Sequence, residues 1–313
     1  MVLLANVTIS GGGIQFTNPS GPTPVPFQGS TSGYTSGGQK NPPAPTVVAT
    51  IDKFPFSSDS SASSVGSLSQ ARYTVAGQSS STFGYTSGGI APPIVARIDK
   101  FPFASDASAT NVGNLSQTRA GAAGQSATAS GYTSGGSTPA LSAVVDKFPF
   151  ASDVNATNVG NLTQARQLPA GQSSTASGYT SGGAGPLNVA TIDKFPFASD
   201  ANATSVGTLS QSRMGPAGQS STVSGYTSGG YSGSQNRIDK FPFASDASAT
   251  TVGNLFQGRW RLAGQSSTAS GYSTGGYYPA RSTIDKFPFA SDSNATNVGS
   301  LTQARWYATG QQV

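Results

Sequence analysis

The residues able to do acid–base or metal chemistry in this chain are almost all aspartates, and they recur at fixed intervals. The 313 residues include no His, no Cys and no Glu, so all 12 acidic residues are Asp. Without His or Cys the chain has no Ser-His-Asp or Cys-His triad, no disulfide and no zinc site with imidazole or thiolate ligands. Six aspartates open the string Asp-Lys-Phe-Pro-Phe, and six follow at Asp59, Asp106, Asp153, Asp200, Asp246 and Asp292.

Metal binding and glycoside hydrolysis are the chemistries that repeated aspartates leave open. The segments from Asp153, Asp200 and Asp292 carry a nearby Asn but lack the Gly and the second acid of a calcium loop. A hydrolytic pair needs two carboxyl groups in different environments, whereas repeated positions are equivalent. Twelve basic residues recur with the aspartates, which favours solvated ion pairs or turn-capping aspartates that fix each repeat against its neighbour. We therefore expect no metal, no cofactor and no enzymatic activity.

Three strings, each present six times, divide the chain into units of about 47 residues, as the spacings of 47, 47, 47, 46 and 46 between successive copies show. Asp-Lys-Phe-Pro-Phe begins at Asp52, Asp99, Asp146, Asp193, Asp239 and Asp285. Gly-Tyr-Thr-Ser-Gly-Gly begins at Gly33, Gly84, Gly131, Gly178 and Gly225, with a Ser-Thr variant at Gly271. Val-Gly-x-Leu-x-Gln-x-Arg ends at Arg72, Arg119, Arg166, Arg213, Arg259 and Arg305.

Each unit contains four short segments rich in Thr, Val, Tyr and Phe, separated by Gly, Asn, Asp or Ser. None has the i, i+3, i+4 apolar spacing of a helix, so we expect four strands per unit and almost no helix. The Pro of Phe-Pro-Phe has no N–H to donate and belongs at a strand end or edge. Four strands in about 47 residues match a propeller blade. The sequence predicts an all-β, six-bladed β-propeller over residues 27–313.

The two ends of the chain are predicted to complete one blade together. A new unit opens with Ala-Gly-Gln, and its last version, Thr309-Gly310-Gln311, falls two residues before the C-terminus. The strands that should follow it lie at Phe27–Gly38. Pairing of these two segments would leave no open sheet edge in the ring.

These units resemble the kelch repeat, in which Gly-Gly closes the second strand and a small-residue strand leads into an Arg. The resemblance covers residues 27–313 and departs from the kelch pattern at the fourth strand, where Val-Gly-x-Leu replaces the usual Trp. Asp-Lys-Phe-Pro-Phe-Ala-Ser-Asp, Ala-Gly-Gln-Ser-Ser and Gly-Tyr-Thr-Ser-Gly-Gly are also similar to kelch-type repeats in virion proteins of tailed bacteriophages, including cyanophages. That second resemblance implies a component of a phage tail, fibre, neck or capsid.

Residues 1–26 lie outside the period and are predicted to form a docking arm with a Pro-rich linker. The segment Val-Thr-Ile-Ser-Gly-Gly-Gly-Ile-Gln-Phe is compatible with a short strand pair, and Pro19, Pro22, Pro24 and Pro26 favour extended geometry. A terminus that is disordered or packs locally is the alternative. The residues expected to dock by strand addition are Val2, Leu4, Ile9, Ile14 and Phe16.

The net charge of +5 comes from the connections between strands. Of the 17 basic residues, 12 match the 12 repeated aspartates, and the remaining five are Lys40, Arg97, Arg237, Arg261 and Arg281. Five charges without a basic run or stripe do not indicate nucleic-acid binding. No apolar run is long enough to insert in a membrane, and Met1–Leu4 is too short for the core of a secretion signal.

The copies differ in two places, between Gly-Gly and the Asp-Lys strand and in the link after each Arg. Because antiparallel strands alternate in direction, both connections are expected on one face of the disc. Trp, Tyr and Arg dominate binding hot spots, so their concentration there predicts a protein or glycan contact patch. Local packing over strand ends is the alternative. The candidate binding residues are Tyr231, Arg237, Trp260, Arg261, Tyr277, Tyr278, Arg281, Trp306 and Tyr307.

From the resemblance and the lack of a catalytic set, we expect a non-enzymatic structural virion protein, made in the host cytoplasm and carried on the extracellular particle. Its expected partners are other virion proteins, with multiple copies on one particle. The alternative is a receptor- or carbohydrate-binding adhesin module that contacts a host surface glycan or receptor.

Overall fold

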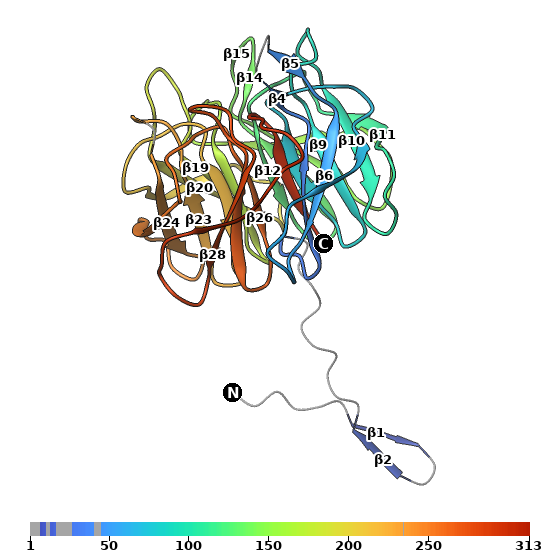
Figure 1. Ribbon diagram of the computed structural model, residues 1–313. Helices are drawn as coiled ribbons and strands as arrows, with labels where there is room; N and C mark the ends of the chain where they lie inside the picture. Colours follow the sequence, from blue (N-terminus) through green and yellow to red (C-terminus); the bar gives the residue numbers. More distant parts are fainter. Residues whose placement is uncertain (1–6, 11–12, 17–26, 41–44, 234) are drawn as a thin grey trace.

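The structure is a computed structural model that describes residues 7–10, 13–16, 27–40, 45–233 and 235–313. Six four-stranded antiparallel sheets stand around a central axis as the blades of a disc (Figure 1). The all-β fold, the six blades and the four strands per blade are therefore confirmed. Across the described ranges the structure contains no helix with the length and hydropathy of a membrane span.

In every blade the strands follow chain order from the axis outward, except in the blade that joins the two ends. Blade 1 holds β30, β3, β6 and β7; blade 2 holds β8 to β11; blade 3 holds β12, β13, β16 and β17; blades 4, 5 and 6 hold β18 to β21, β22 to β25 and β26 to β29.

The innermost strands are β30 (Thr309–Gln312), β8 (Ala76–Ser79), β12 (Ala123–Ser126), β18 (Ala170–Ser173), β22 (Ala217–Ser220) and β26 (Ala263–Ser266). The second strands are β3 (Ser32–Ser36), β9 (Phe83–Ser87), β13 (Ser130–Ser134), β19 (Ser177–Ser181), β23 (Ser224–Ser228) and β27 (Ser270–Thr274). The third strands are β6 (Thr50–Pro55), β10 (Arg97–Pro102), β16 (Val144–Pro149), β20 (Thr191–Pro196), β24 (Arg237–Pro242) and β28 (Thr283–Pro288). The outermost strands are β7 (Ser63–Ser67), β11 (Thr110–Asn114), β17 (Thr157–Asn161), β21 (Thr204–Thr208), β25 (Thr250–Asn254) and β29 (Thr296–Ser300).

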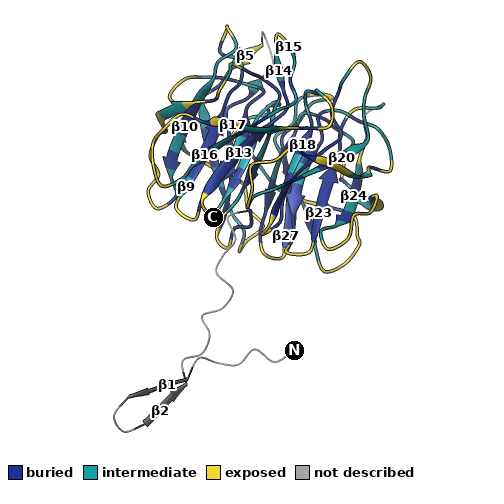
Figure 2. Cartoon of the chain, turned by 180° about the vertical axis from the view of Figure 1, so that it is seen from behind, coloured by how far each residue is buried: buried dark blue, intermediate teal, exposed yellow. Residues whose placement is uncertain are grey.

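The Pro of each Phe-Pro-Phe is the last residue of the third strand, as its missing N–H predicts. Burial falls from the inside outward, so the second strands are almost wholly buried while the outermost strands are half exposed (Figure 2). Exposed residues lie mainly in the turns on the two faces of the disc and in the outermost strands.

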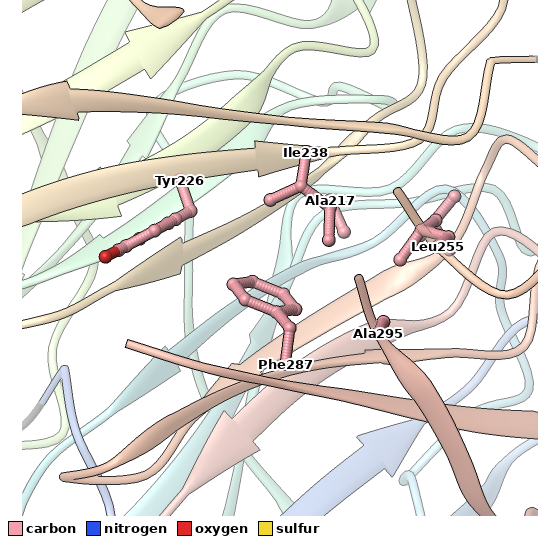
Figure 3. Close-up of a cluster of buried hydrophobic side chains, with 7 residues drawn as sticks. Ala217, Tyr226, Ile238, Leu255, Phe287 and Ala295 are labelled. Atoms are coloured by element: carbon pink, nitrogen blue, oxygen red, sulfur yellow. The ribbon is translucent and has the colours of Figure 1, made fainter. Parts of the chain in front are cut away.

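The hydrophobic core lies between neighbouring blades. At the junction of blades 5 and 6, Tyr226 of β23 faces Phe287 of β28, with ring centroids 5.6 Å apart (Figure 3). Phe289 stacks on the same tyrosine at 4.8 Å. A glycine precedes the tyrosine in each second strand because a Cβ there would lie against the Phe of the adjoining third strand, 2.3 Å from Phe241 in blade 5. The repeated Gly-Tyr and Phe-Pro-Phe strings thus form one packing unit.

The blades meet most closely at the axis, where the innermost strands each contribute a glycine and a glutamine. A Cβ on Gly124 would lie 2.0 Å from the carbonyl oxygen of Gly77, and the other blades repeat this contact. The buried Gln125 amide donates to Ser134 in its own blade and to Tyr179 and Thr180 in the next. The repeated Ala-Gly-Gln therefore holds the blades together at the axis.

Two rings of ion pairs also join each blade to the next. The Arg that ends each unit meets the first Asp of the next unit with both side chains fully buried, as for Arg166 and Asp193 at 3.3 Å. The Lys of each unit pairs with the second Asp of the next unit at the surface, as for Lys147 and Asp200 at 3.0 Å. The expectation of pairs that fix neighbouring repeats is confirmed. Of the two forms that were expected, solvated pairs describe the Lys–Asp ring but not the Arg–Asp ring, because the Arg side chain lies under the next blade, where burial lowers the pKa of Arg166.

The ring closes as predicted. β30 pairs antiparallel with β3, and Gly33 faces Gln312 in the register. Gln311 makes the same contacts as its counterparts, donating to Ser36 in its own blade and to Tyr85 and Thr86 in the next.

Within the described residues, three two-stranded sheets lie outside the blades. β4 (Gln39–Lys40) pairs with β5 (Thr46–Val47), and β14 (Ser137–Thr138) pairs with β15 (Ala140–Leu141). Within the predicted arm, β1 (Val7–Ser10) pairs with β2 (Gly13–Phe16), so the expected strand pair is confirmed. Ile9 faces Ile14 in its register, and Val2 and Leu4 lie outside the described residues.

Candidate functional site

One face of the disc carries all the variable connections. We call it the variable face; it holds the loops from second to third strands and the links from fourth to first strands. Each link pairs with one of these loops through an isolated bridge, for example Trp260 with Tyr277 and Met214 with Tyr231. The two variable sets therefore share one face, as strand direction predicts. The opposite side, the constant face, carries the repeated turns and the C-terminus, which lies across the disc from β4, β5, β14 and β15 (Figure 1).

The aromatic candidates of the variable face form one chain of ring contacts. Tyr231 lies 5.0 Å from Trp260, and Tyr277 lies 6.2 Å from Trp260 and 4.9 Å from Trp306. Both Trp side chains are buried within this chain, whereas Tyr231 is exposed. The two indoles thus cover strand ends and hold the loops, and Tyr231 presents surface to solvent.

Three further candidates, Tyr278, Arg237 and Arg281, are not part of this chain of rings. Tyr278 is 62% exposed at the tip of the loop in blade 6. Arg237 and Arg281 are partly exposed and form no ion pair with any described residue.

The link residues form a closed ring around the axis, which we call the mouth ring. Its members have φ between 53° and 64° and donate their backbone N–H to the carbonyl of the previous member at 2.7 to 2.9 Å. Left-handed backbone favours Gly, and other L residues there are strained. Only backbone atoms make the ring, so the six side chains are free to differ. The members are Thr74, Gly121, Leu168, Gly215, Arg261 and Tyr307.

Two members of the mouth ring, Arg261 and Tyr307, stack on each other. The guanidinium carbon of Arg261 lies 4.1 Å from the ring centroid of Tyr307 and 3.5 Å from that of Trp260. Burial lowers the pKa of Arg261, and burial raises the pKa of the Tyr307 phenol. A guanidinium remains charged at neutral pH despite such a shift.

A cavity of about 60 Å³ opens at the mouth ring and adjoins one of about 110 Å³ along the axis. Arg261, Tyr307 and Leu168 line the outer cavity. The Gly77 and Gly124 backbones and their counterparts line the inner one, which therefore offers mainly peptide groups. The inner cavity is lined mainly by backbone atoms, and the Arg and Tyr side chains lie only at the outer cavity, beside the mouth ring.

On the constant face the axis is covered by Phe27. Its buried side chain lines a cavity of about 50 Å³ among the glycines and serines of the innermost strands. Gly29 pairs in parallel with Ser267 of blade 6, and its N–H donates to the Ser266 carbonyl at 2.7 Å. The chain thus enters the propeller at the axis, on the side away from the variable face.

The variable face carries positive charge without exposed carboxylates. All 12 aspartates belong to the two rings of ion pairs. Six are fully buried and pair with Arg, and the other six lie in turns of the constant face and pair with Lys. Five basic residues are left over. Arg261 and Arg281 lie in connections of the variable face and Lys40 in the β4–β5 hairpin, whereas Arg97 and Arg237 are the first residues of β10 and β24, so the expectation that the excess charge lies wholly in connections is wrong for these two. An anionic partner would therefore meet no like charge there.

The sequence reasoning missed two exposed apolar residues of the variable face, Leu187 and Phe256. In the other five units the position of Phe256 is Ser or Thr, which donates from its N–H and its hydroxyl to the buried Asp of the next blade, as Ser116 does to Asp146 at 2.9 and 2.6 Å. Phe256 offers Asp285 only its N–H, at 3.1 Å, and Asp285 Oδ1 has no partner among described residues. Comparison of Leu-Phe-Gln with Leu-Ser-Gln in the copies was the signal that could have found it.

A scan against models of known protein families matches none for this chain. A search of curated proteins likewise finds no match. The class of protein is therefore defined by the fold alone. It is a six-bladed β-propeller in which strands from both ends of the chain share one blade.

Proposed function

We propose that this propeller is a non-enzymatic binding module displayed on a larger particle, attached through its N-terminal arm and contacting partners through its variable face. The observation that supports this most directly is the separation of the two faces. The chain enters at the axis on the constant face, whereas the unpaired charges and the copy-to-copy differences lie on the opposite face.

The particle we propose is the virion of a tailed phage, with the propeller as a structural component of the tail, fibre, neck or capsid in multiple copies. The similarity of the repeats to kelch-type virion repeats supports this assignment.

Deletion of residues 1–24 tests the attachment. The propeller should keep its melting temperature, because the segments that close the ring begin at Phe27, and incorporation into the particle should be lost. Replacement of residues 1–24 by a Gly/Ser segment of equal length is the control for simple tethering. Normal copy number of the deleted protein on purified particles would contradict the proposal and would leave the disc itself as the attachment surface.

The second candidate is an adhesin that binds a carbohydrate or receptor on the host surface. The exposed aromatic residues together with the five unpaired basic residues favour it. The two candidates are compatible, since a module carried by its arm can bind with its free face. Binding of host-surface glycans by the isolated propeller, which lacks the arm, would support the adhesin function independently of attachment.

A further inference from the structure

Arg261 is the least explained charged residue of the propeller. Its guanidinium forms no hydrogen bond and no ion pair with any described residue, and its Nε is buried without a partner. Trp260, on which it stacks, also has a buried indole N–H with no acceptor among the described residues. A buried Nε without a partner also occurs in the six arginines of the buried ring, but each of those forms an ion pair with an Asp, whereas Arg261 forms none with a described residue. Both donors of this stack therefore lack an acceptor.

The backbone at Arg261 adds a second unusual feature. Its φ of 58° is a conformation that Gly adopts without strain, and Gly occupies two of the six equivalent positions. The hydrogen bond that Arg261 contributes to the mouth ring comes from its backbone N–H, which Gly would also supply. The fold gains stacking on Trp260 and Tyr307 from this guanidinium, but no hydrogen bond and no ion pair to a described residue.

We propose that the mouth ring binds one oxyanion of an acidic polysaccharide, a carboxylate or a sulfate, through the N–H groups of Arg261. This inference rests on the proposed binding role of the variable face and names its ligand. Stacking on Trp260 and Tyr307 uses the flat faces of the guanidinium, so its edge remains free to donate two parallel hydrogen bonds. The adjoining cavity of about 60 Å³ has room for several water molecules, and hence for an oxyanion.

The surroundings favour a polysaccharide over an acidic protein. A stable protein interface needs a continuous patch of about 800 Å² on each partner. The exposed apolar residues of this face, Leu187, Tyr231, Phe256 and Tyr278, are instead distributed over blades 4, 5 and 6. An extended peptide would pair with a free strand edge, but the links and loops around the mouth already pair with each other. Successive sugar units of an extended chain can instead contact these separate residues one after another.

Binding of short oligosaccharides to the full chain tests the site. The ligands are an oligogalacturonate, a sulfated galactose oligomer, the neutral galactose oligomer and a poly-aspartate peptide, measured by calorimetry at low salt. At least one acidic oligosaccharide should bind and the neutral one should not. Affinity should fall at least tenfold in Arg261→Gly and should weaken as salt is added.

Arg97→Gln is the matched control, because it removes a positive charge outside the mouth ring and its cavity. It should bind as the wild type does, and both variants should remain folded in melting curves, since the strain that Gly relieves at position 261 offsets the stacking that Arg261 loses. Unchanged affinity in Arg261→Gly, equal binding of neutral and acidic oligomers, binding of poly-aspartate alone, or no binding at all would each overturn the inference. None of these results would bear on attachment through the arm, which the deletion of residues 1–24 tests separately.

Discussion

Replacement of Phe256 by Ser should stabilise the propeller, although it removes an aromatic side chain. In the other five units a Ser or Thr hydroxyl donates to the buried carboxylate at 2.6 to 2.8 Å, and Asp285 lacks this bond. A hydrogen bond to a charged group contributes about 1.5 to 3 kcal/mol. Phe256 is 62% exposed, so its loss should cost only about 0.5 to 1 kcal/mol of apolar burial. The net gain expected in free energy of unfolding is about 1 to 2 kcal/mol.

Phe256→Ala isolates the contribution of the hydroxyl. It removes the same ring and leaves Asp285 Oδ1 unpaired, so it should be less stable than Phe256→Ser by about 1.5 to 3 kcal/mol. Equilibrium denaturation in urea measures the difference, with equal slopes showing that the unfolded state is unchanged. If Phe256→Ser were no more stable than Phe256→Ala, the missing hydroxyl would not be the reason for the unpaired carboxylate oxygen. A gain with Phe256→Ser would mean that Phe256 is kept at a cost in stability, as residues selected for binding are.

Two further predictions concern the rings of charge and the core. Arg166→Met leaves Asp193 buried without its partner and should lower the free energy of unfolding by about 3 to 5 kcal/mol. Lys147→Met removes the partner of the exposed Asp200 and should lower it by only about 0.2 to 1 kcal/mol. Equal losses in urea denaturation would contradict the claim that burial makes the Arg–Asp pair more important than the Lys–Asp pair. Burial, with a smaller effect from Asp153, raises the pKa of Tyr85 from 10.0 to about 12. The folded state then retains a proton that the unfolded state loses, so stability should fall as the pH rises from 10 to 12, and the fall should be smaller in Tyr85→Phe.

The architecture could be predicted from the sequence because the six copies are nearly identical. The strings fix the number of blades, and their first and last fragments fix how the ring closes. Phe27 was included in the closing segment as a strand residue. Its position over the axis could not be read from the chain, because no other unit has a counterpart.

The environment of the charges was harder to predict than their pairing. Arg213 and Asp239 are 26 residues apart and belong to different units, yet they meet at 3.0 Å with both side chains buried. A spacing shared by all copies indicates a repeated contact but not which blade covers it. Burial is decided by the neighbouring blade, which packs its second strand over the guanidinium, as the bond from Arg213 to the Thr227 carbonyl shows.

The candidate site was predicted as a face and as a set of residues, and the structure buries two members of that set. Trp260 and Trp306 were expected at a binding surface, but pairing between links and loops buries both. The mouth ring gave no chemical signal, since Thr, Gly, Leu, Arg and Tyr share only a backbone conformation there. Phe256 did give a signal, as the one aromatic residue at a position otherwise restricted to Ser and Thr.

The division between constant and variable positions follows from which atoms join the blades. The repeated Gly, Gln, Arg and Asp side chains contact the next copy, so a change in one unit must suit its neighbour. The mouth ring joins all six blades through N–H and carbonyl groups alone, so its side chains can change one at a time without loss of that connection. The mouth ring is therefore a contact between all six blades at which the sequence can still vary. This is why we expect ligand specificity to lie at the mouth, and why a guanidinium in one of six equivalent positions is more informative than the repeated charges.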